Sequence, residues 1–188
     1  MADAFAEERE MIAYRGHTLG IHAMYLYDLG QFTQSETMMK QSLEIIKKTK
    51  TDIYTPILWA YYAASLHANG RHTEAESAEA AAYEMVELGH EQWSLAEVHR
   101  VIGSAYFDHG SNARKAWMKV GEAIKVAEEQ GANLWLLRAT SDWLRVAESK
   151  KHIGDATVAL KSAIAQFPDP DYGHLDLKTA VEQLKNTA

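Results

Sequence analysis

Apolar side chains recur along the chain at intervals of three and four residues, which is the spacing of one face of an α-helix. Met11, Ile12, Leu19, Ala23 and Leu26, for example, share one face of a first stretch. Polar residues and glycines interrupt this pattern at regular intervals, so the sequence predicts an all-α chain. We expect helices at about residues 3–29, 33–48, 51–69, 73–89, 91–109, 112–130, 133–150, 155–167 and 171–185.

Three glycines divide the chain into similar lengths. Gly30, Gly70 and Gly110 are 40 residues apart, and each follows an apolar run and precedes a new one. Glycine suits the left-handed conformation just beyond a helix end. The spacing predicts four antiparallel helical hairpins, with one residue inserted near Ser111 and with Lys151 in place of the fourth turn glycine. We assign the repeats to residues 3–50, 51–90, 91–131 and 132–168, with a capping helix at 171–186, in a single domain spanning 1–188.

Small residues occupy equivalent places in these repeats. Ala23, Ala63 and Gly103 each stand seven residues before a turn glycine. Such residues let the two helices of a hairpin approach closely. One hairpin cannot bury its own apolar face, so the hairpins are expected to stack into an α-α superhelix. Gly16 and Gly20 indicate a close helix crossing, and a ligand contact is the alternative.

This pattern resembles the tetratricopeptide repeat (TPR). The residues that carry the likeness are Ile102, Gly103, Tyr106, Ala116 and Ala123 in the third repeat, Trp59, Ala75 and Ala82 in the second, and Ala156, Ala163 and Pro168 in the fourth. Ordinary TPR units have about 34 residues. The longer repeat is similar to the C-terminal TPR region of bacterial adenylate-cyclase/predicted-ATPase and maltose-regulator-type signalling proteins, on the stretches Trp93–Tyr106 and Gly131–Leu177. Glu79, His22 and Thr140 depart from the pattern.

The charge and the cysteine content of the chain limit the kinds of molecule that it can bind. The formal net charge is −7 and the pI is about 5.7, which argues against nucleic acid or a membrane surface as a direct partner. The chain has no cysteine, so it can form neither a disulfide nor a cysteine–zinc site. The acidic N-terminus is unlike a secretion signal, and no apolar run has the length of a membrane span. We therefore expect a cytoplasmic protein.

No motif for catalysis or for a cofactor stands out. The nine histidines include no HExxH pair, and both His17/His22 and His67/His72 are five residues apart, a spacing that separates side chains on one helix. Residues 169–173 faintly resemble a calcium loop, but Ala180 stands where that loop has a glutamate, so a turn and helix cap is the better interpretation. Phosphate loops and nucleophile–base sets are absent from the sequence, and we expect neither an enzyme nor a metal site.

The resemblance implies that the first helix of each hairpin lines a concave groove that binds a protein or peptide. By position in the repeat, the expected groove residues are Met24, Tyr27, Asp28, His67, Arg100, Ser104, Phe107, Arg138, Ser141 and Arg145. The three arginines are hypothesised to clamp an acidic peptide or a small anion. The alternative is that they pair with the nearby carboxylates of Glu97, Asp108, Asp142 and Glu148.

The function expected from this pattern is that of a protein-interaction or scaffold module in bacterial signalling. Extended concave surfaces serve that role in stacked-hairpin proteins. A homodimer formed through an exposed terminal hairpin is a further expectation. The alternative is a small-molecule-sensing regulatory domain of a transcriptional regulator or cyclase, because regulators of the similar type receive inducers on their repeats.

Overall fold

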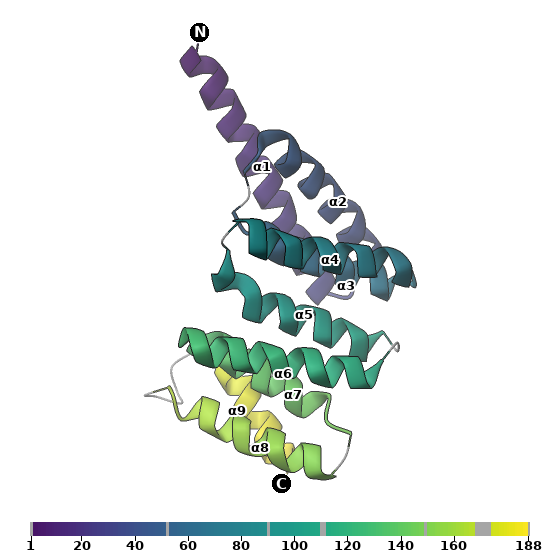
Figure 1. Ribbon diagram of the computed structural model, residues 1–188, viewed down its shortest axis with the longest axis vertical. Coiled ribbons are helices and arrows are strands. Elements are labelled where there is room, and N and C mark those ends of the chain that lie inside the picture. The colour runs from purple at the N-terminus through teal and green to yellow at the C-terminus, as the bar shows by residue number, and fades with distance from the viewer. Residues whose placement is uncertain are drawn as a thin grey trace. The chain divides into compact units, whose positions relative to one another are not determined.

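A computed structural model describes residues 2–51, 53–89, 91–109, 112–148, 150–167 and 174–187, and the backbone of these residues is almost entirely helical (Figure 1). Within these ranges there are nine α-helices, one short 3-10 helix and no strand, as the periodicity predicts. The chain forms two compact units, an N-terminal unit, Met1–Ser94, and a C-terminal unit, Leu95–Ala188. Gly110, Ser111, Pro168 and residues 169–173, which the sequence analysis singled out, lie outside the described residues.

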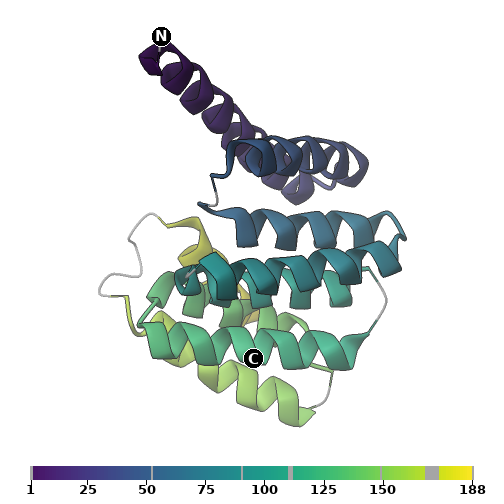
Figure 2. The same cartoon turned by 45° about the horizontal axis from the view of Figure 1, so that its top comes forward.

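The N-terminal unit contains two antiparallel helical hairpins. Its elements are α1 (Ala2–Asp28), α2 (Phe32–Thr49), α3 (Thr55–Ala68), α4 (His72–Gly89) and the 3-10 helix η1 (Gln92–Ser94). Helix α1 pairs with α2 and α3 pairs with α4, and α3 also packs on both α1 and α2. Figures 1 and 2 show that the N-terminal part of α1 extends beyond α2.

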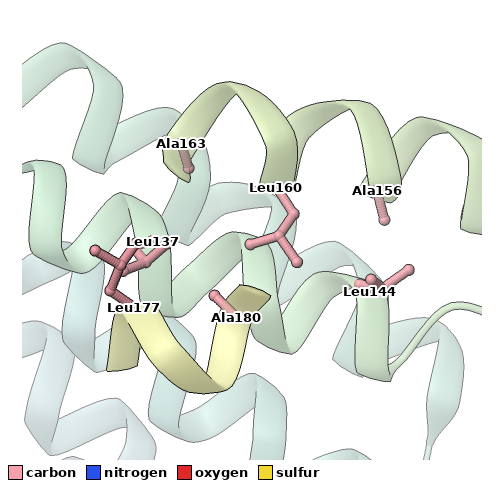
Figure 3. Close-up of a cluster of buried hydrophobic side chains, with 7 residues drawn as sticks. All are labelled: Leu137, Leu144, Ala156, Leu160, Ala163, Leu177 and Ala180. Carbon is pink, nitrogen blue, oxygen red and sulfur yellow. The ribbon is translucent and has the colours of Figure 1, made fainter. Parts of the chain in front are cut away.

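The C-terminal unit repeats this arrangement and adds one helix. Its elements are α5 (Leu95–Asp108), α6 (Ala113–Gln130), α7 (Asn133–Arg145), α8 (Lys150–Ile164) and α9 (Leu175–Thr187). Helix α7 packs on α5 and α6 and pairs with α8, and α9 in turn packs on both α7 and α8. Figure 3 shows the resulting core, in which Leu137 and Leu144 of α7, Leu160 of α8 and Leu177 of α9 converge.

Gly30 and Gly70, two of the three predicted turn glycines, adopt the conformation expected of them, and the third, Gly110, lies outside the described residues. Gly30 and Gly70 have φ angles of +74° and +76°, and Gly131 at the end of α6 has +63°. After Gly30, the N–H of Gln31 donates to the carbonyl of Leu26 at 2.8 Å, and the same bond closes the other two helix ends. This Schellman geometry satisfies the last carbonyls of each helix.

The first backbone hydrogen bond of the second helix in each hairpin supports the one-residue insertion predicted near Ser111. The N–H of Ser35 donates to Gln31, and that of Ala75 donates to Arg71. In the third hairpin the equivalent bond joins Ala116 to Asn112, which is one residue later in the repeat. The side chain of Asn112 also caps α6 by accepting the N–H of Lys115 at 2.9 Å.

Glycines mark the closest helix contacts. A Cβ atom on Gly103 would lie 2.7 Å from Cγ2 of Val120 and 3.0 Å from its backbone nitrogen, so α5 and α6 touch at this point. A Cβ on Gly20 would lie 2.7 Å from Leu58, and one on Gly16 would lie 2.9 Å from Ile45. These two glycines therefore serve the helix crossing that the sequence indicates.

Several predicted helix boundaries are wrong. Helix α7 ends at Arg145 rather than near residue 150, and α8 already begins at Lys150, so Lys151 lies within a helix and not in a turn. The reason is packing, because the His152 ring stacks on Trp117 at 4.1 Å and Ile153 packs against the core of Figure 3. Helix α3 begins at Thr55 instead of near residue 51, with Pro56 in its first turn as expected.

Candidate functional site

The groove residues expected on α5 and α7 lie in a network of charged side chains. Arg100 on α5 donates from Nε and Nη2 to the two carboxylate oxygens of Glu97, both at 2.8 Å. Its Nη1 donates to Oδ2 of Asp142 on α7 at 2.6 Å, and the hydroxyl of Ser104 donates to the same oxygen at 2.8 Å. Arg100 is mostly buried, so this fork joins two helices within the unit.

Helix α9 covers the next part of the α7 surface. Arg138 donates to Asp176 of α9 at 2.9 Å and to Glu97 of α5 at 3.2 Å. One turn further along α7, Ser141 bonds to the side chain of Gln183, whose amide nitrogen donates back to the Ser141 carbonyl at 2.9 Å. Arg138 and Ser141 therefore hold the capping helix in place.

Arg145 ends α7 at the more open edge of the network. Its Nη1 pairs with Asp108 of α5, and its Nε lies 3.2 Å from Oδ1 of Asp142. The guanidinium carbon lies 5.4 Å from the centre of the Phe107 ring. The side chains of Arg145 and Asp108 keep 36% and 37% of their surface exposed, in contrast to 16% for Arg100. Phe107, Asp108 and Arg145 together form what we call the Arg145 platform.

The neighbouring arginines determine the protonation state of the two buried acids, Glu97 and Asp142. Burial by itself raises the pKa of Asp142, but the guanidinium groups of Arg100 and Arg145 outweigh it and hold this pKa below its ordinary value. The pKa of Glu97 is lowered in the same way, with Arg100 and Arg138 overcoming the effect of burial. Both carboxylates are thus ionised at neutral pH, and the arginines compensate their charge.

Each of the three arginines expected to clamp an anion therefore has carboxylate partners. Glu97, Asp108 and Asp142, proposed as partners from the sequence, are among them. Asp176 is a further partner that the sequence analysis missed, because it lies on α9, 38 residues from Arg138. No local spacing signals a contact of that kind.

The four expected groove residues of the N-terminal unit differ in exposure. Met24 and Tyr27 of α1 are half-buried and Asp28 is exposed. The Tyr27 ring contacts Phe32 at 5.3 Å and Tyr61 at 5.6 Å between centroids, so this tyrosine joins the first hairpin to α3.

His67 is not a surface residue, since only 2% of it is exposed. Its Nε2 lies 3.0 Å from Oε1 of Glu79 on α4, and its Nδ1 lies 3.1 Å from Nδ1 of His72. The prediction that the spacing separates His67 from His72 is wrong, because a turn rather than one helix connects them. Glu79 departs from the apolar pattern of the repeat because it pairs with His67.

Over the part of the chain that the structure describes, no three histidine or acidic side chains gather in a geometry that could hold a metal ion. Within the same ranges, no helix combines the length and the apolar character that crossing a bilayer requires. What the described residues do present is helix surfaces of mixed charge and apolar character.

Comparisons of the chain with protein-family models, with curated proteins and with solved structures find no match.

Proposed function

We propose that the chain is a protein-interaction module built from TPR-like repeats, and that it binds an acidic peptide segment of a partner protein in a signalling or regulatory setting. The 40-residue period of its hairpins and the packing of α7 on both α5 and α6 support the TPR-like interpretation. The signalling setting rests on the resemblance to long-repeat TPR regions.

The observation that carries this proposal is the Arg145 platform. The first helices of two consecutive hairpins, α5 and α7, lie side by side, as the groove-lining helices of a stacked-hairpin protein do. At their exposed edge they present a cation, an anion and an aromatic ring within a few ångströms of one another. Mixed polar and aromatic surfaces of this kind are typical of protein-binding sites.

The chemistry of the platform favours an acidic ligand. An ion pair exposed to water contributes little stability, so a carboxylate from a peptide can replace Asp108 on Arg145 at small cost. The Phe107 ring beside the guanidinium offers an apolar contact to the neighbouring side chain of the same peptide. Arg100 is engaged by two buried acids, and removing it would leave their charges uncompensated.

A peptide-binding measurement tests the proposal. Fluorescently labelled peptide pools of equal length, one acidic, one neutral and one basic, are titrated with the purified chain, and binding is followed by fluorescence anisotropy. We expect the acidic pool to bind most tightly and its affinity to fall as salt is added. Arg145→Ala and Phe107→Ala are each expected to weaken this binding about tenfold or more.

Arg114→Ala is the matched control, since Arg114 is exposed on α6 and the change removes the same charge. We expect it to leave the affinity within about twofold of the wild type. Equal binding of the three pools, or equal losses from Arg145→Ala and Arg114→Ala, would contradict a role for the platform.

A further inference from the structure

Helix α1 carries a row of exposed apolar side chains. Met11, Tyr14, Ile21 and Tyr25 are 73%, 72%, 64% and 59% exposed, and Thr18, also exposed, lies between them. Their spacing is three, four, three and four residues, so the five side chains form one straight seam along the helix. We call it the α1 seam.

The seam is not the face by which α1 packs in its own unit. That face carries Ala13, Gly16, Gly20 and Ala23, which are buried against α2 and α3, and it points to the opposite side of the helix. The two faces together make α1 apolar on both sides. Figures 1 and 2 show it as the first helix of the unit, with its N-terminal part reaching beyond α2.

The seam has the spacing and the size of a helix-pairing interface. Apolar residues alternating three and four apart are the a and d positions by which two helices interlock. Leu29, just beyond the helix end, is 53% exposed. Together with the four large residues of the seam it exposes roughly 700 Å² of surface to solvent, close to the ~800 Å² per partner of a stable interface. Exposed patches of this size mark protein contacts.

We propose that the α1 seam is a homodimer interface, in which α1 of a second copy of this chain packs antiparallel on α1 across a two-fold axis. The part of the seam from Tyr14 to Tyr25 is complementary to itself in this orientation. Tyr14 then faces Tyr25 of the second copy at both ends, and the small Thr18 faces the bulky Ile21 at both central positions. A two-fold interface requires this match of one patch with its own reverse.

This inference goes beyond the peptide-binding proposal and does not depend on it, because the seam and the Arg145 platform lie in different units. Sedimentation equilibrium of the full chain over a range of concentrations up to about 100 µM tests it by mass action. We expect a monomer–dimer equilibrium in the wild type. Ile21→Glu is expected to weaken dimerisation at least tenfold, because it places a charge at the centre of the buried seam.

Val158→Glu provides the control, since Val158 is 70% exposed on α8, a helix of the C-terminal unit. We expect this variant to dimerise like the wild type, and circular dichroism establishes that both variants remain helical. A wild-type chain that stays monomeric at the highest concentration would overturn the proposal, and so would equal effects of the two substitutions.

Cross-linking determines the orientation, because the chain has no cysteine of its own. The variants Tyr14→Cys and Tyr25→Cys are oxidised separately and as a mixture. The antiparallel arrangement predicts that the mixture forms a disulfide-linked dimer and that neither variant alone does so efficiently. Efficient cross-linking of each variant with itself would mean a parallel pair and would overturn the arrangement proposed here.

Discussion

The imidazole of His67 and the carboxylate of Glu79 lie 3.0 Å apart between α3 and α4, and both residues are buried. Glu79 stands where the repeat pattern calls for a large apolar residue. A buried polar group that loses its partner costs about 1–3 kcal/mol. Glu79→Leu is therefore expected to lower the free energy of unfolding by about 2 kcal/mol, as measured by urea denaturation.

The double variant Glu79→Leu/His67→Leu separates the pair from its surroundings. Two apolar side chains of suitable size can replace a buried polar pair at little cost. We expect the double variant to be more stable than Glu79→Leu alone, with a coupling energy of about 1–2 kcal/mol between the two sites. Additive losses would mean that the two side chains do not depend on each other.

Gly103 and Gly154 make a matched pair of helical glycines. A methyl group at Gly103 would meet Val120 at 2.7 Å, whereas one at Gly154 of α8 would meet nothing within 4 Å. Gly103→Ala is expected to destabilise the protein by about 1–3 kcal/mol through forced separation of α5 and α6. Gly154→Ala should stabilise it by about 0.5–1 kcal/mol, because alanine favours the helix. Thermal unfolding of both variants checks the two signs.

Lys50 ends α2 in a left-handed conformation, with φ of 55°, where Gly131 ends α6 in the same conformation. A side chain in this region costs about 1 kcal/mol relative to glycine. Lys50→Gly is expected to raise the free energy of unfolding by about that amount. Gly131→Lys should lower it by a similar amount, and unfolding by denaturant measures both. A loss of stability in Lys50→Gly would contradict the conformation at this helix end.

His99 on α5 gives the protein a predictable response to pH. Burial, with a smaller contribution from Lys119, lowers the pKa of His99 to about 4. The unfolded chain, with an ordinary histidine pKa of about 6.5, then binds more protons than the folded one between these two values. The stabilising contribution of the neutral His99 is fully present above pH 6.5, and about 3 kcal/mol of it is lost as the pH falls to 4.

Unfolding by urea at a series of pH values between about 7 and 4 measures this slope. His99→Gln removes the titrating group and keeps a polar side chain. We expect the variant to lose less stability than the wild type over this window. The lowered pKa of His17, also caused by burial, affects both proteins equally and cancels in the comparison. Identical slopes would show that His99 does not titrate as described.

Periodicity predicted the helical class and the hairpins because each helix buries one face, and the apolar residues of that face are spaced three and four apart in the sequence. The turn at Gly30 followed from the same reasoning, since its backbone conformation favours glycine. The end of α7 and the start of α8 could not be predicted in this way. His152 of α8 stacks on Trp117 of α6, and a contact between residues so far apart leaves no local pattern in the sequence.

The candidate site was predictable only in part for a similar reason. The phase of the repeat placed Arg145 near Asp108, and the structure pairs them. It did not reveal that α9 lies over Arg138, or that His67 turns inward to Glu79. Contacts between side chains far apart in the sequence depend on how helices pack, which a repeat pattern does not specify.

An acidic peptide is proposed to bind at the open edge between α5 and α7. Nuclear magnetic resonance of the isotopically labelled chain, titrated with the tightest-binding peptide of the acidic pool, tests this claim most directly. We expect the largest chemical-shift changes on Phe107, Asp108 and Arg145 and only small changes on α6 and α8. Largest changes on α6 or α8, or none that saturate with added peptide, would contradict this claim.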